Sequence, residues 1–196
     1  MTDKLIAAFG ALVIVAVASF ALAAERPDKP AYDATDVTGV AWGRNFHLLG
    51  HDGKPHELAD FRGKVVALYF GYTRCPDVCP TTMAALGQAV RLLGSDAERV
   101  QGLFVTVDPR HDKPAVLGQY VASFNESFIG LYGDVQATKR TAREFKVESG
   151  RAHSTPVFVF DPGGRLRLIL RPNATPQSIA RDVRLLLGAD GASSRG

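Results

Sequence analysis

Two cysteines, Cys75 and Cys79, are the residues of this chain best suited to carry chemistry, and both lie in the stretch GYTRCPDVCPTTM. Three residues separate them, and a proline follows each one. A deprotonated thiol is both the nucleophile of disulfide exchange and a ligand for soft metal ions. The stretch therefore has three possible roles: a structural disulfide, a redox couple or a metal site.

Proline after each cysteine biases Cys75 and Cys79 away from helical dihedral angles, which predicts a turn leading into a helix that starts near Pro80. Both sulfurs should then lie at the amino terminus of that helix, where the helix dipole and the unpaired N–H groups favour thiolate over thiol. Arg74 adds a positive neighbour, whereas Asp77 acts in the opposite direction.

The types of ligand separate the three roles further. Two thiolates suit Cu(I), with a nearby imidazole as a natural third ligand, whereas structural zinc needs a fourth nitrogen or sulfur ligand and the chain has no further cysteine. A structural disulfide is disfavoured because closing so short a loop removes little entropy from the unfolded chain. Disulfide exchange stays open, although the three-residue spacer differs from the usual Cys-x-x-Cys motif.

The elements that must position the cysteines alternate between strands and helices. Strands are predicted at residues 46–49, 56–58, 65–70, 103–107, 157–160 and 166–170, with a further short apolar stretch at 128–132. Helices are predicted at 83–93, 135–145 and 175–188, and another near Pro114 that should turn inward Val116, Leu117, Tyr120, Val121 and Phe124.

This order predicts an α/β fold with a central mixed sheet flanked by helices, and a thioredoxin-like fold satisfies it. In such sheets the ligand or reaction site lies at the carboxyl end of a central strand, where the chain turns into a helix. Cys75 and Cys79 should occupy that place, between the strand at 65–70 and the helix at 83–93.

Outside this domain, residues 1–24 contain an uncharged apolar run from Leu5 to Ala24, at roughly 20 residues long enough to span a bilayer as a helix. Its length favours a membrane anchor, and a small-x-small pattern at its end leaves a cleaved signal peptide open. Either alternative predicts that the domain is exported. Residues 25–36 are predicted to be a linker, 37–188 the domain, and 189–196 a disordered tail.

The composition describes a single globular domain, with 46% hydrophobic and 22% charged residues among 196. The formal net charge is +3, and the basic residues are scattered among acidic ones. Because they form no basic cluster with aromatic residues, the sequence predicts no nucleic-acid partner.

The cysteine stretch resembles the signature of the Sco/SenC family of copper chaperones for cytochrome c oxidase assembly. Three further stretches resemble the family in the same order: ADFRGKVVALYF, VTVDPRHDKP and AHSTPVFVFDPGG. The resemblance implies a thioredoxin-like domain that binds copper through Cys75, Cys79 and His153. It also implies delivery of copper to the binuclear copper site of cytochrome c oxidase subunit II. With the predicted membrane helix, this places the domain on the periplasmic side of the inner membrane.

Two departures from the family pattern lie near His153. The loop before it is shorter than usual, and Ala152 stands where the family has an aspartate, which removes an expected partner of the imidazole. Pro156 resembles the cis-proline position of thioredoxins. The alternative function is therefore a membrane-associated thiol–disulfide oxidoreductase, in which Cys75 attacks and Cys79 resolves. A metallochaperone needs no covalent chemistry, so under the first hypothesis the protein is not an enzyme.

The remaining polar candidates are interpreted as structural. Three histidines surround the predicted hairpin and fit no single metal geometry, which makes them surface or strand-edge residues: His47, His51 and His56. His111 lies in a polar loop. Asp108 and Asp112 are expected to form a turn and to cap the following helix.

Overall fold

The structure is a computed structural model that describes residues 31–147, 156–171 and 173–193. The predicted apolar span and His153 lie outside these residues. Among the residues described, no helix combines the length and the apolar character needed to cross a membrane. The chain divides into residues 1–31 and a compact unit that begins at Tyr32, and the following paragraphs concern that unit.

Eight strands form one mixed sheet in the order β1-β8-β7-β4-β5-β6-β2-β3. Their bounds are β1 Thr35–Asp36, β2 His47–Gly50, β3 Pro55–Glu57, β4 Val65–Gly71, β5 Val100–Thr106, β6 Ile129–Tyr132, β7 Val157–Phe160 and β8 Leu166–Ile169. Strands β4, β5 and β6 run parallel to one another, while β7 pairs antiparallel with β4. Strand β4, with its cysteine turn, is thus in the middle of the sheet.

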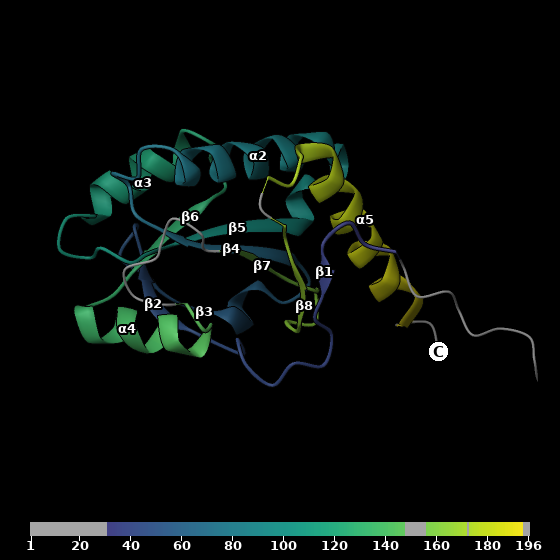
Figure 1. Ribbon diagram of the computed structural model, residues 1–196, viewed down its shortest axis with the longest axis horizontal. Helices are drawn as coiled ribbons and strands as arrows, with labels where there is room; N and C mark the ends of the chain where they lie inside the picture. The colour runs from purple at the N-terminus through teal and green to yellow at the C-terminus, as the bar shows by residue number, and fades with distance from the viewer. Residues whose placement is uncertain (1–30, 148–155, 172, 194–196) are drawn as a thin grey trace, which may run out of the picture. The chain divides into compact units, whose positions relative to one another are not determined.

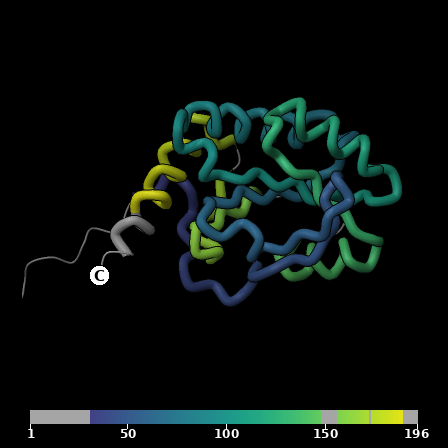
Figure 2. The backbone as a smooth tube through the Cα atoms, turned by 180° about the vertical axis from the view of Figure 1, so that it is seen from behind, coloured from purple at the N-terminus to yellow at the C-terminus, as the bar shows by residue number. Residues whose placement is uncertain are grey.

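Helices cover both faces of this sheet (Figure 1). Their bounds are η1 Leu58–Phe61, α2 Val78–Leu92, η2 Gly94–Arg99, α3 Pro114–Ala122, α4 Val135–Glu144 and α5 Pro176–Ser193, where η marks a short 3₁₀ helix. Helices α2, α3 and α5 lie on one face and α4 on the other. The reverse view in Figure 2 shows the same layers, with α5 at one end of the domain, where it packs against α2.

The side chains of β4 alternate between two apolar layers. One layer lies under α2, α3 and α5 and receives Val65, Ala67 and Tyr69. The opposite layer receives Val66, Leu68 and Phe70. All seven residues of β4 and all seven of β5 are buried, as predicted for strands covered on both faces. Each large apolar side chain buried in this way contributes about 1.5–3 kcal/mol to the free energy of folding. This burial holds in place the strand that ends at the cysteine turn.

The mixed α/β order of elements is confirmed, with different boundaries at several ends. Helix α2 begins at Val78, before Pro80, so Cys79 lies in its first turn. The inward orientation predicted for Val116 is wrong, since its side chain is 43% exposed. Leu117 and Val121, four residues apart, form the buried face of α3, and Val116 lies on the flank beside them.

The folded unit also extends beyond the bounds expected from the sequence. The backbone N–H groups of Asp33 and Ala34 donate to the carboxylate of Asp182 at 2.9 and 2.8 Å. Strand β1 then pairs with β8, so residues 33–36 belong to the domain and not to a linker. At the other end, α5 continues past Gly188 to Ser193, so the first residues of the expected tail are helical.

Candidate metal centre

The structure brings Cys75 and Cys79 together at the carboxyl end of β4, as predicted. Cys75 lies in the turn after the strand and Cys79 in the first turn of α2. Both are free thiols, with 5% and 0% of their surface exposed. The backbone N–H of Cys79 donates to the sulfur of Cys75 at 3.4 Å. The two sulfurs therefore share the amino terminus of the helix.

Gly71, the last residue of β4, makes room for this arrangement. A Cβ atom at this position would lie 3.0 Å from the sulfur of Cys79 and 2.8 Å from the ring of Phe104. The first turn of α2 can thus pack directly onto the end of the strand only because residue 71 has no side chain.

The two thiols differ in acidity. Burial raises the pKa of the Cys75 thiol, but hydrogen bonds from the Cys79 side chain and from the backbone of Cys79 and Asp77 outweigh it, so this pKa lies below its ordinary value. Burial and the hydrogen bond to Cys75 raise the pKa of Cys79 to about 11. Cys75 is therefore the first of the pair to become a thiolate.

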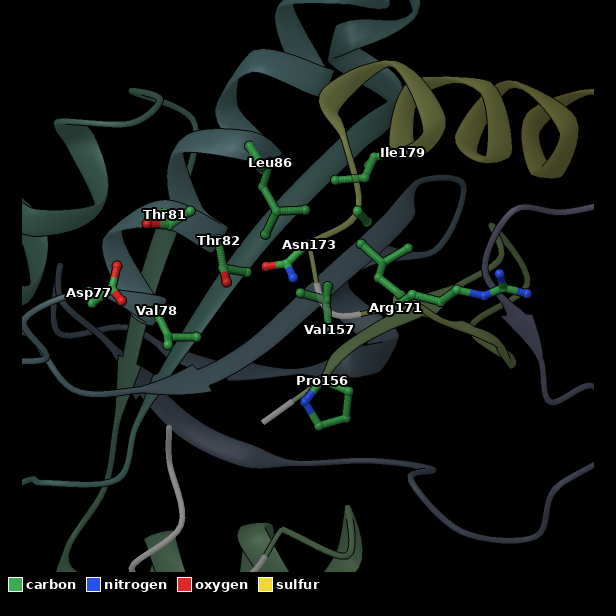
Figure 3. A pocket seen from close by; sticks show the side chains of 13 residues that line it. Asp77, Val78, Thr81, Thr82, Leu86, Pro156, Val157, Arg171, Asn173 and Ile179 are labelled. Atoms are coloured by element: carbon green, nitrogen blue, oxygen red, sulfur yellow. The ribbon is translucent and has the colours of Figure 1, made fainter. Parts of the chain in front are cut away.

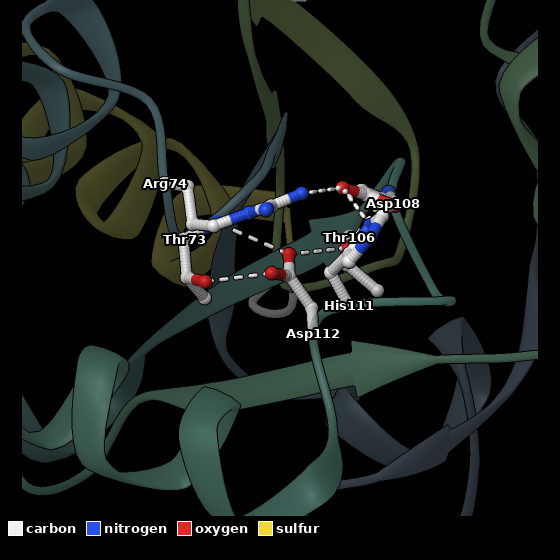
Figure 4. A network of polar contacts seen from close by, with 6 residues as sticks. All are labelled: Thr73, Arg74, Thr106, Asp108, His111 and Asp112. Carbon is white, nitrogen blue, oxygen red and sulfur yellow. Dashed lines mark hydrogen bonds and ion pairs between the residues drawn. The ribbon is translucent and has the colours of Figure 1, made fainter.

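A buried carboxylate holds the cysteine turn in place (Figure 4). Asp112, which is 1% exposed, accepts hydrogen bonds from the backbone N–H of Thr73 at 3.0 Å and from its hydroxyl at 2.6 Å. It also accepts from the hydroxyl of Thr106, at the end of β5, at 2.6 Å. Asp112 thus ties the turn after β4 to the end of the neighbouring strand.

The expected role of the two aspartates is only partly correct. A turn is present, since the N–H groups of His111 and Asp112 both donate to the carbonyl of Asp108. The helix-capping role is wrong, because Lys113 is the N-cap of α3 and no side chain caps it. Asp112 is oriented towards Thr73 and Thr106 instead, and its carboxylate accepts hydrogen bonds from both.

Asp108 forms an ion pair with Arg74 and a hydrogen bond with His111 at the rim of the same turn. Its carboxylate lies 3.0 Å from the guanidinium of Arg74 and 2.9 Å from Nδ1 of His111. Burial opposes ionisation of Asp108, but the hydrogen bonds with His111 and Arg74 hold its pKa below the ordinary value. Arg74 therefore directs its charge to Asp108, although the sequence suggested only an effect on the cysteines.

A pocket of about 290 Å³ opens beside the cysteine turn. Figure 3 shows Asp77 and Val78, from the start of α2, on one side of it and Pro156 and Val157 on the other. Pro156, the residue before β7, thus faces the start of α2 across this pocket. His153 itself, three residues before Pro156, lies outside the described residues, as does the residue that precedes Pro156.

Each of the three hairpin histidines has a different position or hydrogen-bond partner, as expected of structural residues. His47 is exposed and pairs with Glu57 across the hairpin at 3.2 Å. Nδ1 of His51 accepts the backbone N–H of Gly130 at 3.1 Å. His56 lies on the edge strand β3. Within the described ranges, no three His, Cys, Asp or Glu side chains are grouped so that they could hold a metal ion.

Sequence reasoning missed three residues that shape the site: Gly71, Asp112 as an anchor of the turn, and Tyr69. The hydroxyl of Tyr69 donates to the sulfur of Cys79 at 3.6 Å. One signal was present in the sequence. A tyrosine within the otherwise apolar run VVALYF needs a partner for its hydroxyl once the strand is buried.

The chain is similar to one family of proteins along most of its length. The SCO1/SenC family model matches residues 35–188. The mitochondrial SCO2 homolog of Mus musculus is 32% identical over 158 residues, which cover 74% of this chain but only 62% of that protein. An SCO2-like protein of Rickettsia felis is 28% identical over 190 residues, covering 90% of this chain and 93% of that one.

Solved structures give the same result for the fold. The structure of Bradyrhizobium japonicum ScoI with copper bound has 30% sequence identity and a TM-score of 0.66, covering 74% of this chain and 99% of that one. This likeness confirms the thioredoxin-like fold predicted from the order of strands and helices.

Proposed function

Because the chain belongs to the SCO1/SenC family, we propose that it is a metallochaperone that receives Cu(I) on Cys75 and Cys79 and passes it to a partner protein. One observation carries the proposal: two buried, reduced thiols share the first turn of α2. Two such sulfurs supply the soft ligands that Cu(I) prefers. Copper is bound in the related ScoI structure.

We assign the third ligand to His153. The chain after it enters the sheet at Pro156, which lines the pocket beside the cysteine turn. Two thiolates and one imidazole leave the metal with few ligands, so an incoming sulfur or nitrogen from a partner can add before one of the original ligands leaves. Transfer by such ligand exchange needs no covalent intermediate and no electron transfer.

The two cysteines and Asp112 have different roles in holding the metal. Cys75, with its lowered pKa, presents a thiolate first, and Cys79 loses its proton as the metal binds. Asp112 keeps the turn fixed to β5, so the sulfurs need little reorganisation on binding.

The proposed recipient is the binuclear copper site of cytochrome c oxidase subunit II. A Sco protein of known structure is described as a member of the Sco family of cytochrome c oxidase assembly proteins. We place the domain on the periplasmic side of the inner membrane, held by the apolar run from Leu5 to Ala24. Amino-terminal sequencing of the mature protein tests this placement, because a chain that begins near Ala24 would have lost the anchor.

Thiol–disulfide exchange is the second candidate function. The lowered pKa of Cys75 suits it to be the attacking thiol, and the raised pKa of Cys79 is consistent with a resolving thiol. Pro156 lies across the pocket from the turn, where a substrate chain could pass. This function predicts rapid exchange with exported protein disulfides and no need for His153.

Titration with Cu(I) against a competing chelator distinguishes the two functions. The reduced protein should bind one Cu(I) per chain, and the protein with Cys75 and Cys79 joined as a disulfide should bind none. His153→Ala should weaken Cu(I) binding at least tenfold, because removing even a residue that supports a metal ligand costs on the order of tenfold in affinity. Its disulfide-exchange rates should be unchanged. Equal copper uptake by oxidised and reduced protein would refute the proposal, and His153→Ala with unchanged affinity would favour the oxidoreductase.

A further inference from the structure

A phenol hydroxyl contacts the deeper of the two cysteines. Tyr69 projects from β4 into the layer under α2 and is fully buried. Its hydroxyl donates to the sulfur of Cys79 at 3.6 Å. The single proton of Tyr69 is therefore directed to Cys79.

A second tyrosine provides a natural comparison. Tyr120, from α3, lies beyond the ring of Phe104, with ring centroids 5.1 Å apart, and Tyr69 lies 6.1 Å from that ring. Burial, and after it the negative charge that Cys79, Cys75 and Asp112 can carry, raises the pKa of the Tyr120 phenol. Its hydroxyl oxygen is buried and has no hydrogen-bond partner among the described residues. Of these two phenols, Tyr69 makes a hydrogen bond to a cysteine sulfur and Tyr120 does not.

We propose that Tyr69 is a positioning residue that stabilises the reduced, metal-receiving form of the cysteine pair against closure of the Cys75–Cys79 disulfide. Closure requires the two sulfurs to approach to about 2.05 Å, which draws the sulfur of Cys79 towards Cys75. A sulfur bonded in a disulfide is also a poorer acceptor than that of a thiol. The buried hydroxyl of Tyr69 would lose its acceptor on oxidation, and an unpaired buried hydroxyl disfavours the oxidised state.

Tyr69 is not itself oxidised or reduced in this proposal. Reduction of the disulfide takes two electrons and two protons, breaks the S–S bond and yields two thiols. With glutathione as the reductant, two glutathione molecules supply the electrons and protons and become one glutathione disulfide. Tyr69 changes only the equilibrium constant of this exchange.

This inference deepens the proposed function. It rests on that function only in explaining why the protein needs its cysteines reduced. Copper needs both sulfurs free, so a bias towards dithiol keeps the protein ready to receive it in an oxidising compartment. The equilibrium between dithiol and disulfide is measured on the metal-free protein, so the result does not depend on copper binding.

The test is a redox titration of the full-length, metal-free protein in glutathione buffers, with the reduced fraction read by mass after alkylation of free thiols. Tyr69→Phe should favour the disulfide about tenfold, equal to a reduction potential about 30 mV lower for this two-electron couple. Tyr120→Phe is the matched control: it removes a buried phenol oxygen beside the same cysteines that makes no hydrogen bond, and it should leave the potential unchanged.

A merely structural role for Tyr69 would lower the stability of both redox forms alike and leave the potential as in the wild type, and that result overturns the proposal. An equal shift in Tyr120→Phe overturns it too, since loss of any phenol would then suffice. If Tyr69→Phe does not fold, 3-fluorotyrosine at position 69 supplies the test. It keeps the ring, makes the hydroxyl a stronger donor, and should shift the equilibrium towards the dithiol. An unchanged potential in that variant refutes the inference.

Discussion

Replacing Gly71 with alanine should damage the fold and the metal centre together. The new Cβ would lie 2.8 Å from the ring of Phe104 and 3.0 Å from the sulfur of Cys79, both buried and enclosed by neighbours. Neither neighbour is the free end of a flexible surface side chain, so the strand end and the first turn of α2 must separate. Overpacking of this kind costs about 1–3 kcal/mol.

Urea unfolding of the reduced, metal-free Gly71→Ala protein measures that cost. Cu(I) titration of the same variant should show weaker binding, because the sulfur of Cys79 is displaced relative to Cys75. Gly188→Ala is the matched control. Gly188 is an exposed residue of α5 with no atom within 4 Å of an added Cβ, and alanine there should stabilise the helix by roughly 0.5–1 kcal/mol. A Gly71→Ala protein as stable as wild type, with unchanged Cu(I) affinity, would refute the packing argument.

Two further predictions concern the cysteine turn. Asp112→Asn should lower the free energy of unfolding by about 1.5–3 kcal/mol, because the hydrogen bonds that the buried carboxylate accepts from Thr73 and Thr106 are lost or weakened. Asp108→Asn, at the exposed rim, should cost no more than about 1 kcal/mol in the same denaturation assay, and equal losses would contradict this assignment. In the metal-free reduced protein, Cys75 should be alkylated by iodoacetamide faster than Cys79. Because its pKa is lowered and that of Cys79 is raised, the reaction of Cys75 should persist to lower pH, whereas Cys79 should react only near pH 11. Peptide mapping of the labelled protein across pH checks this, and equal rates at every pH would show that the asymmetry is absent.

Much of the fold could be predicted because its signals are local. The apolar run of β4, the helical spacing along α2 and the turn-forming stretch between them depend on residues close in the chain. The prolines after Cys75 and Cys79 restrict the backbone at those positions, so a turn at the strand end followed from the sequence. The place of both cysteines at the carboxyl end of a central strand followed from the order of elements alone.

Other features depended on contacts between distant segments, which no local pattern encodes. Asp112 lies 39 residues after Thr73, and only the parallel pairing of β4 with β5 brings the two together. Residues 33–36 were predicted to be a linker because they are polar and show no apolar period. Their partners, Asp182 and β8, are far away in the sequence.

The sequence by itself thus determined which residues can carry the chemistry, since thiols, prolines and apolar periods are properties of the chain. The tertiary structure decided what surrounds the sulfurs. Tyr69 contacts Cys79 because a central strand and the helix that follows it pack closely, and Gly71 permits that approach. Acidity and hydrogen bonding depend on such distances, which exist only after the layers have packed.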